Sequence, residues 1–372
     1  MTEVDVSDSS TLISNLRPSA WMREGIKDPD NTIAILGKKG GPGKTSLAQN
    51  VIDAAVRMGL NVLALDGDPQ GNLSIALDSQ VQRIDTGKTS IGGKKVLEPD
   101  RLTMVEVLAE DADGVIDEAV QLCPWEYKED AEFTRGGPLV PGKLGTVGVV
   151  PTYSPMEDLA RGWSLSDLNR LDRALHRPLV SGGVAPSLRW DLVIGDMLPG
   201  GSDLARVFLK AMRRYVLLTT AQPFGINAIS DTLTFARDTR DNWGNPRLQD
   251  LGLVFTSYTP QGRVARQQMA DLRAAQQAGV EDVNVEVWEP RMSTRTVVPT
   301  SQSYRAQVSR FLTEKSDRVA ATEICQISEA ILLKILHKIG HPDAADLEER
   351  WRAAWPDLSP WATGEITKKE TA

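Results

Sequence analysis

The sequence predicts an α/β fold in which a doubly wound, mostly parallel β-sheet is flanked by helices. Short apolar runs rich in β-branched residues recur along the chain, and windows of helical periodicity separate them. A glycine-rich loop joins the first apolar run to the first helical window. Because each expected strand is followed by a crossover of helical length, the strands should run parallel.

Seven apolar segments are expected to be buried strands. They span residues 32–36, 62–65, 147–150, 192–194, 215–218, 251–255 and 283–287. The helical windows span residues 44–58, 103–120, 155–176, 202–213, 225–239, 262–277 and 302–338. In the last window, isoleucines recur every three or four residues from Ile324 to Ile339, so one face of that helix is apolar. The simplest interpretation of this stripe is core packing.

Composition and charge limit the class of protein. The chain has 372 residues, of which 41% are hydrophobic and 25% charged, as in soluble globular proteins. Its net charge is −8, so any contact with nucleic acid must be local. Cys123 and Cys325 stand far apart, which argues against a disulfide framework or a zinc site. Because the N-terminus is acidic and no apolar run reaches the roughly 18 residues of a membrane span, we expect a cytoplasmic protein.

The glycine-rich loop after residue 36 has the composition of a phosphate-binding loop. Gly40, Gly41 and Gly43 allow the backbone to approach phosphate oxygens, and the N-terminus of the following helix presents positive partial charge. We expect Lys44 on the β- and γ-phosphate oxygens of a nucleoside triphosphate and the Thr45 hydroxyl on Mg²⁺. The alternative is a glycine-rich turn with solvated lysines.

The loop departs from the ordinary Walker A pattern at one position. That pattern has glycine six residues before the lysine, where this chain has Lys38. The sequence Lys-Gly-Gly-x-Gly-Lys-Thr, which begins at Lys39, instead resembles the deviant Walker A motif of the ParA/MinD family of P-loop ATPases. By this resemblance, Lys39 reaches the phosphates bound by the other subunit of an ATP-dependent homodimer. The resemblance assigns ATP contacts to Lys39, Gly40, Gly41, Pro42, Gly43, Lys44, Thr45, Ser46 and Pro290, with Lys39, Lys44 and Asp68 in catalytic roles.

Two acidic motifs add to the resemblance. Asp66 and Asp68 follow the second expected strand, at the edge where nucleotides bind, and resemble the family's switch I sequence Asp-x-Asp-Pro-Gln-Gly-Asn. The resemblance implies that Asp68 positions or activates the attacking water and that Asp66 lies near the metal ion.

Asp196 ends an apolar strand of Walker B form and, with Thr45, is expected on the metal side. The family usually continues with two prolines where this chain has Met197, which leaves the geometry of switch II open. An Asp-capped turn and a chance apolar run are the alternatives for these motifs.

The resemblance implies a ParA-type partition ATPase that acts in plasmid or chromosome segregation. Its ATP-bound dimer would bind DNA without sequence preference, and a centromere-binding ParB-like protein would stimulate its slow hydrolysis of ATP. Such a protein would be associated with the nucleoid. The arginines that would contact DNA phosphates are Arg263, Arg266, Arg291, Arg295 and Arg310. Solvated helix faces explain these arginines equally well.

Other functions are available to the same fold. A MinD-like membrane or cargo-positioning ATPase would carry an amphipathic helix at its extreme C-terminus, whereas here thirty-odd residues follow the apolar stripe through Ile331 and Ile335. The sequence therefore disfavours a membrane partner. A small-molecule ligase or a reductase component is the remaining class. We expect the histidines at the surface or in packing rather than in a catalytic set; they are His176, His337 and His341.

Three parts are expected along the chain. They are an N-terminal arm at 1–30, a P-loop ATPase domain at 31–318 with surface insertions at about 79–100 and 124–146, and a C-terminal helix with a tryptophan-containing tail at 319–372. A short helix should follow Arg17, with Pro18 in its first turn. The tail would be either a partner site or a packed extension.

Overall fold

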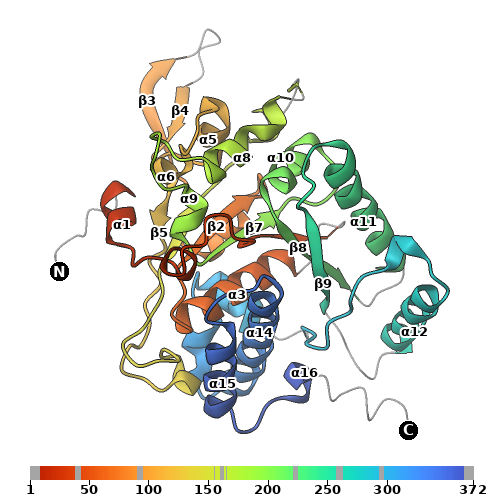
Figure 1. Cartoon of the computed structure of the whole chain (residues 1–372). Helices are drawn as coiled ribbons and strands as arrows, with labels where there is room; N and C mark the ends of the chain where they lie inside the picture. The colour runs from red at the N-terminus through yellow and green to blue at the C-terminus, as the bar shows by residue number, and fades with distance from the viewer. Residues whose placement is uncertain are drawn as a thin grey trace.

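The computed structural model has one β-sheet between two layers of helices (Figure 1). It describes residues 9–37, 43–89, 95–154, 156–159, 163–164, 166–220, 225–256, 263–292 and 297–363. Among these residues, seven strands form the sheet in the order β5-β6-β2-β7-β1-β8-β9. The strands are β1 (Thr32–Leu36), β2 (Val62–Gly67), β5 (Gln121–Leu122), β6 (Val147–Val150), β7 (Leu192–Met197), β8 (Arg214–Thr220) and β9 (Gln249–Thr256). All neighbours pair in parallel except β5, which is antiparallel to β6. The predicted fold class is confirmed.

Three long helices cover one face of the sheet. They are α3 (Lys44–Arg57), α14 (Arg318–Lys338) and α15 (Ala344–Ala354), with the short α16 (Pro360–Thr363) beyond them (Figure 1). Alternate side chains of β1, such as Ile33 and Ile35, belong to the core on this face. The isoleucine stripe of α14, from Ile324 to Ile339, is buried at 0–7% exposure. The prediction that this stripe packs in the core is therefore confirmed.

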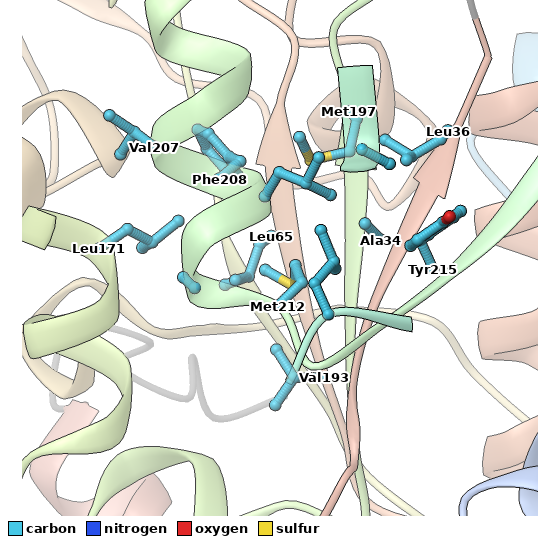
Figure 2. Packing of buried hydrophobic residues seen from close by; sticks show 14 of the residues in the cluster. Ala34, Leu36, Leu65, Leu171, Val193, Met197, Val207, Phe208, Met212 and Tyr215 are labelled. Carbon is cyan, nitrogen blue, oxygen red and sulfur yellow. The ribbon is translucent and has the colours of Figure 1, made fainter. Parts of the chain in front are cut away.

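The opposite face of the sheet carries a second apolar core. Its helices are α5 (Met104–Glu110), α6 (Ile116–Ala119), α8 (Arg170–His176), α10 (Asp203–Ala211), α11 (Gly225–Asn242) and α12 (Arg263–Gln277). Figure 2 shows Val207 and Phe208 of α10 beside Leu65 of β2 and Met197 of β7. Because side chains alternate along each strand, neighbouring residues of one strand supply the two cores.

The predicted helical windows are confirmed in four cases and divided in three. Windows 44–58, 202–213, 225–239 and 262–277 correspond to α3, α10, α11 and α12. Window 103–120 is interrupted by Asp111, which caps α5 in the left-handed region at φ 55°. Window 155–176 contains α7 (Met156–Leu159), η2 (Asp167–Asn169) and α8, and window 302–338 contains the end of α13 (Val297–Ser303), η4 (Val308–Thr313) and α14.

The strand predicted at residues 283–287 is wrong. Residues Glu281–Val283 form the 3₁₀ turn η3, and the following chain touches β9 at two isolated parallel bridges, Val287 with Leu253 and Met292 with Thr256. The indole of Trp288 lies against Gly252 of β9, where a Cβ would come within 2.1 Å of its Nε1. The backbone around Val287 still bonds Leu253 of β9, so this segment forms a bridge rather than a strand.

The N-terminal arm is packed against the domain. It contains α1 (Ser9–Asn15) and α2 (Ala20–Arg23). The predicted short helix is present as α2, but Pro18 precedes its N-cap residue Ser19 and is not in its first turn. Trp21 is 2% exposed, and its Nε1 donates a 2.8 Å hydrogen bond to the Asp191 carbonyl. The arm therefore contributes to the core on the α3 side.

The two predicted insertions differ in their packing. The first contains the antiparallel hairpin β3 (Arg83–Thr89) and β4 (Lys95–Pro99), which projects from the body of the molecule (Figure 1). The second contains the 3₁₀ turn η1 (Phe133–Arg135) and is not wholly at the surface. The ring of Phe133 is 5% exposed and lies 4.0 Å below the guanidinium of Arg57. An apolar ring within a segment rich in glycine and proline anchors this insertion.

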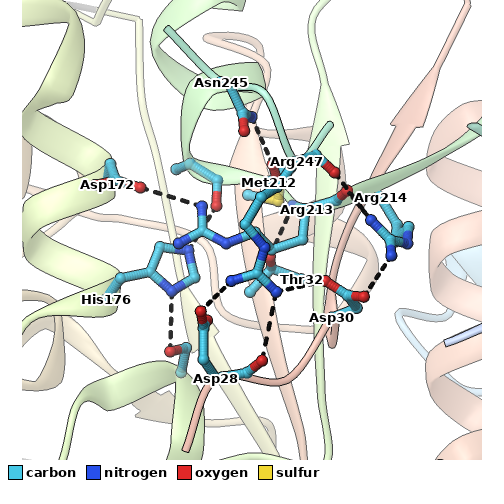
Figure 3. Close-up of polar contacts among 12 residues, drawn as sticks. Asp28, Asp30, Thr32, Asp172, His176, Met212, Arg213, Arg214, Asn245 and Arg247 are labelled. Carbon is cyan, nitrogen blue, oxygen red and sulfur yellow. Dashed lines mark hydrogen bonds and ion pairs between the residues drawn. The ribbon is translucent and has the colours of Figure 1, made fainter. Parts of the chain in front are cut away.

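A polar cluster closes the amino edge of the sheet (Figure 3). Asp30 accepts a 2.7 Å hydrogen bond from Arg247 and a second from Arg214, and Arg213 bonds Asp172 at 3.3 Å. These ion pairs join the residues before β1 to the starts of β8 and β9. The carboxyl edge lies at the other end of the strands, away from this cluster.

The three histidines lie at the surface or in packing, as expected. His176 and His341 take part in packing, while His337 is exposed and bonds Glu348 at 2.6 Å. Cys123 and Cys325 are free thiols. Within the described residues, no helix combines the length and the apolar composition that a bilayer crossing requires.

Candidate nucleotide site

The candidate site lies where the carboxyl end of β1 leads into α3. Four of the predicted loop residues lie outside the described residues and stay predictions; they are Lys39, Gly40, Gly41 and Pro42. Gly43 immediately precedes α3 and has a φ of 146°. A Cβ at this position would lie 3.0 Å from Thr256 Oγ1 and 3.1 Å from Leu218 Cδ2. Close approach of β8 and β9 to the loop therefore requires glycine here.

The first turn of α3 meets the end of β7. Lys44 is buried, at 7% exposure, and Thr45 Oγ1 donates a 2.5 Å hydrogen bond to Asp196 Oδ2. This bond joins the phosphate-binding loop to the Walker B strand. The structure therefore brings together two side chains that the sequence assigns to the metal ion.

Asp66 is the second buried acid at this edge. It is the register partner of Asp196 in the parallel pair of β2 and β7. Its Oδ2 accepts hydrogen bonds from the backbone N–H of Ser74 at 2.7 Å and from the Ser74 hydroxyl at 2.6 Å. Ser74 lies on α4 (Asn72–Ala76), directly after the switch I sequence. Sequence reasoning missed Ser74, and the available signal was its place just after the switch I motif.

The two strand carboxylates concentrate negative charge in a buried place. Burial raises the pKa of Asp66 to about 6, against the lowering effect of the Ser74 hydrogen bonds. Burial raises the pKa of Asp196 to about 7, and the neighbouring charge of Asp66 adds to this, while Thr45 and Lys44 act in the opposite direction. Carboxylates destabilised in this way favour a nearby cation.

The residues present fit a magnesium ion that is shared with a nucleotide. Asp196 Oδ1 is buried and has no hydrogen-bond partner among the described residues, and its other oxygen already bonds Thr45. Both groups supply oxygen, the ligand atom that Mg²⁺ prefers. In the described part of the chain, no three His, Cys, Asp or Glu side chains converge on one point. An ion here would therefore take its other ligands from water and phosphate oxygens, as Mg²⁺ does in nucleotide sites.

Asp68 takes up the turn arrangement that was the alternative interpretation of its motif. Its Oδ1 accepts a 3.0 Å hydrogen bond from the Gln70 N–H, and its own N–H donates to Asp66 Oδ1 at 3.3 Å. The side chain is partly exposed at the mouth of the site. It is therefore close to the buried acids but bonded to its own turn.

A cavity of about 280 Å³ opens beside the first turn of α3. Its lining combines the loop and helix residues with switch I and with one residue from far along the chain: Gly43, Thr45, Ser46, Asn72, Ile75, Ala76 and Gln302. Gln302 Nε2 donates a 3.1 Å hydrogen bond to Ser46 Oγ. Gln302 lies on α13 and has no motif around it, so the sequence gave no reason to select it.

Comparison with known proteins identifies the family. The family described as CbiA, the CobQ/CobB/MinD/ParA nucleotide binding domain, matches residues 33–306. The chain belongs to this family. Three similar proteins show how much of the chain, and at what identity, can be aligned with known members of this fold.

The chromosome-partitioning ATPase Soj of Thermus thermophilus is 27% identical over 242 residues, which are 65% of this chain and 75% of Soj. The chromosome partitioning protein ParA of Caulobacter vibrioides is 25% identical over 249 residues, or 66% of this chain and 77% of ParA. Apo McdA of Cyanothece has the same fold, with a TM-score of 0.54 and 16% identity over 80% of this chain and 98% of McdA.

Two further predicted contacts of the nucleotide-binding domain lie apart from the cavity beside α3. Pro290 lines a separate groove of about 480 Å³ with Leu333 of α14 and Trp351 of α15. Arg291 is 2% exposed, so it is a poor candidate for a DNA phosphate contact, and we no longer propose it as one.

The remaining predicted arginines are placed as follows. Arg263 and Arg266 are exposed on the first turn of α12, and Arg310 is exposed in η4. Arg295 lies outside the described residues. The exposed side chains are available to a phosphate backbone, and they are equally compatible with a solvated surface.

Proposed function

We propose that the protein is an ATP-hydrolysing switch of the ParA type, which dimerises on ATP and then binds DNA without sequence preference. The observation that carries the proposal is the hydrogen bond between Thr45 and Asp196 beside the buried Asp66. This arrangement at the N-terminus of α3 suits a Mg²⁺-bound triphosphate. Membership of a nucleotide-binding family, with Soj and ParA among its similar proteins, supports the same proposal.

The chain's own groups would divide the work as follows. Lys44 and the N–H groups at the start of α3 would bind the β- and γ-phosphates. Thr45 and Asp196 would hold Mg²⁺, which when bound withdraws charge from the phosphate oxygens. Asp68 would exchange its bond with the Gln70 N–H for an attacking water and orient it. Lys39 would reach the phosphates of the partner subunit and so make dimerisation depend on ATP.

DNA binding would use exposed basic groups on α12 and in η4. Arg263 and Arg266 on α12, together with Arg310, would neutralise phosphates locally although the whole chain carries a net charge of −8. A ParB-like protein bound to a centromere would stimulate hydrolysis and release the dimer from the nucleoid. The proposed location is therefore the nucleoid-associated cytoplasm.

A DNA-binding experiment tests this part of the proposal. Wild type with ATP and Mg²⁺ should shift a random duplex at low salt, and the Arg263→Ala/Arg266→Ala double variant should bind it at least about tenfold more weakly. Arg352→Ala, which removes an exposed arginine from α15, is the matched control and should bind as wild type does. Absence of ATP-dependent binding by wild type at low salt would refute the DNA-binding role.

The MinD-like alternative predicts a different partner. Its membrane helix would need an exposed apolar face near the C-terminus, whereas Ile331 and Ile335 are fully buried against the sheet and α3. Flotation with anionic liposomes and ATP separates the two functions. Recovery of the protein with the liposomes, without DNA binding, would favour the MinD-like function over the ParA-type function.

A further inference from the structure

The cavity beside α3 contains a hydrogen bond whose polarity is fixed. Gln302 Nε2 lies 3.1 Å from Ser46 Oγ. An amide nitrogen can only donate, so the serine oxygen must accept. The serine hydrogen is then left to point elsewhere. Ser46 and Gln302 line the same cavity as Thr45, so the nearest open space for that hydrogen is the space beside the phosphate-binding loop.

Two contacts with α3 hold the segment that carries Gln302. Gln49 Nε2 donates to the Ala306 carbonyl at 3.1 Å, and Asp53 accepts from the Ser309 N–H at 2.9 Å and from the Ser309 hydroxyl at 2.7 Å. Gln49 and Asp53 are 0% and 3% exposed, so water does not compete for these bonds. The position of Gln302 relative to α3 is therefore fixed before any nucleotide binds.

A third contact joins the same segment to the switch I side. Arg305 Nη1 lies 3.3 Å from Oδ1 of Asp78, a residue that follows α4 closely in the chain. In addition, α13 packs against α4. Gln302 thus stands between the phosphate-binding helix and the switch I helix. An amide in this place can act on a ligand of the cavity through Ser46.

We propose that Gln302 is a positioning residue for nucleotide binding, which keeps the Ser46 hydroxyl oriented as a hydrogen-bond donor toward a phosphate oxygen. The inference rests on the proposed ATP site. Without the amide, the serine hydroxyl would rotate and donate to the carbonyl of Gly43, the N-cap residue three positions earlier. The donor toward the phosphate would then be lost for part of the time.

Two substitutions at position 302 separate orientation from simple packing. Gln302→Ala removes the amide and leaves the serine hydroxyl without its fixed partner. Gln302→Glu keeps the shape but replaces the donor by a carboxylate, so Ser46 would donate to the glutamate and turn away from the phosphate. The added negative charge beside a triphosphate acts in the same direction. Gln302→Glu should therefore weaken binding more than Gln302→Ala.

The test is a double-mutant cycle with Ser46, read by calorimetric binding of Mg-ADP and a non-hydrolysable ATP analogue. Gln302→Ala should raise the Kd about tenfold, and Gln302→Glu should raise it further. In a Ser46→Ala background, Gln302→Ala should change the Kd by less than about twofold, because its effect passes through the serine. Thermal unfolding without nucleotide should be nearly the same for wild type and Gln302→Ala.

The control is Gln307→Ala in the same segment. Gln307 donates to the Glu126 carbonyl, away from the cavity, so its loss should lower the unfolding temperature and leave the Kd unchanged. An unchanged Kd for Gln302→Ala, or equal effects of this change with and without Ser46, would overturn the positioning role. Failure of wild type to bind either nucleotide would overturn the ATP site and this inference with it.

Discussion

At the scale of single residues, the candidate site consists of buried acids and the groups that bond them. Asp196 is 1% exposed, has one oxygen on Thr45 and the other without a partner among the described residues, and lies beside Asp66. Buried carboxylates of this kind are costly to a protein unless a cation or a donor compensates them. A bound cation, as proposed above, would compensate them.

Asp196→Asn separates these two contributions. The change keeps the shape of the side chain, removes one buried charge beside Asp66 and weakens the oxygen ligand for Mg²⁺. We expect Mg²⁺-dependent nucleotide affinity to fall at least about tenfold, while the unfolding temperature of the free protein stays the same or rises. Titration of a nucleotide with and without Mg²⁺ measures the first effect and calorimetry the second. A variant that binds Mg-nucleotide as tightly as wild type would remove Asp196 from the metal site.

His176 gives a pH dependence that is separate from the nucleotide site. Its Nε2 donates to the Ala211 carbonyl at 2.7 Å, and burial lowers its pKa from 6.5 to about 4, with the charge of Arg213 acting in the same direction and Asp172 and Asp28 opposing (Figure 3). As the pH falls below 6.5, the unfolded chain takes up a proton that the folded chain refuses until about pH 4. The unfolded state then binds more protons, so stability must fall over this range.

The expected loss through His176 is about 2 to 3 kcal/mol between pH 6.5 and 4. Urea unfolding of wild type and His176→Gln at several pH values measures it, since glutamine cannot titrate. The difference in the free energy of unfolding between the two proteins should change by that amount as the pH falls. A difference that stays constant with pH would show that His176 is not held neutral.

At the scale of elements, α3 connects the nucleotide site to the C-terminal part of the chain. Four polar residues spaced three or four apart lie on one face of this helix: Ser46, Gln49, Asp53 and Arg57. Each bonds the segment between Gln302 and Glu329. At the far end, Arg57 pairs with Glu329 at 2.7 Å with both side chains at most 1% exposed.

The tryptophans of the tail complete this buried pair. The indoles of Trp351 and Trp355 both donate to Glu329 Oε2 at 2.7 Å. The described part of the tail is therefore a packed extension, which was one of the two interpretations left by the sequence. Its packing depends on a charge supplied by the helix that begins at the phosphate-binding loop.

Removal of one member of the pair should be far more harmful than removal of both. Arg57→Met leaves the Glu329 carboxylate buried with only indole donors and should cost about 3 to 5 kcal/mol of unfolding free energy. Adding Glu329→Leu should recover a large part of this loss. Arg350→Ala, which breaks an exposed pair with Asp346, should cost less than about 0.5 kcal/mol. Denaturant unfolding measures all of these variants, and a double variant as unstable as Arg57→Met would contradict the account.

Sequence periodicity predicts elements whose own residues determine them. The runs that became β1, β2 and β7, the window that became α3 and the isoleucine stripe of α14 have unambiguous apolar patterns. The two-residue β5 carries no such pattern, and the apolar run at 283–287 meets β9 only at an isolated bridge. In both cases tertiary contacts decide the outcome.

The same distinction applies to the site. Thr45 and Asp196 were predicted because each lies in a motif with a fixed relation to a strand end. Gln302 follows Ser46 by 256 positions and enters the site through the packing of α13 against α4 and its hydrogen bond to Ser46 of α3. Glutamine carries only a neutral amide, and Gln302 differs from other glutamines of the chain only by its position in the fold.

At the scale of the whole molecule, the proposed switch requires one surface to respond to what binds at another. The candidate nucleotide site lies at the carboxyl edge of the sheet, while Arg263 and Arg266 are exposed on α12 at the periphery (Figure 1). A dimer that forms only with ATP would present two copies of the basic surface to the same DNA, and this raises affinity through effective concentration. Dimerisation is therefore the step on which the whole proposal depends.

Light scattering measures that step directly. We would compare wild type and Lys39→Ala with ADP, with ATP and with a non-hydrolysable analogue, each with and without random duplex DNA. Wild type should be a monomer with ADP and a dimer with ATP or the analogue, whereas Lys39→Ala should bind nucleotide and stay a monomer. A Lys39→Ala variant that dimerises on ATP as readily as wild type, or a wild type whose mass does not change with nucleotide, would contradict the account.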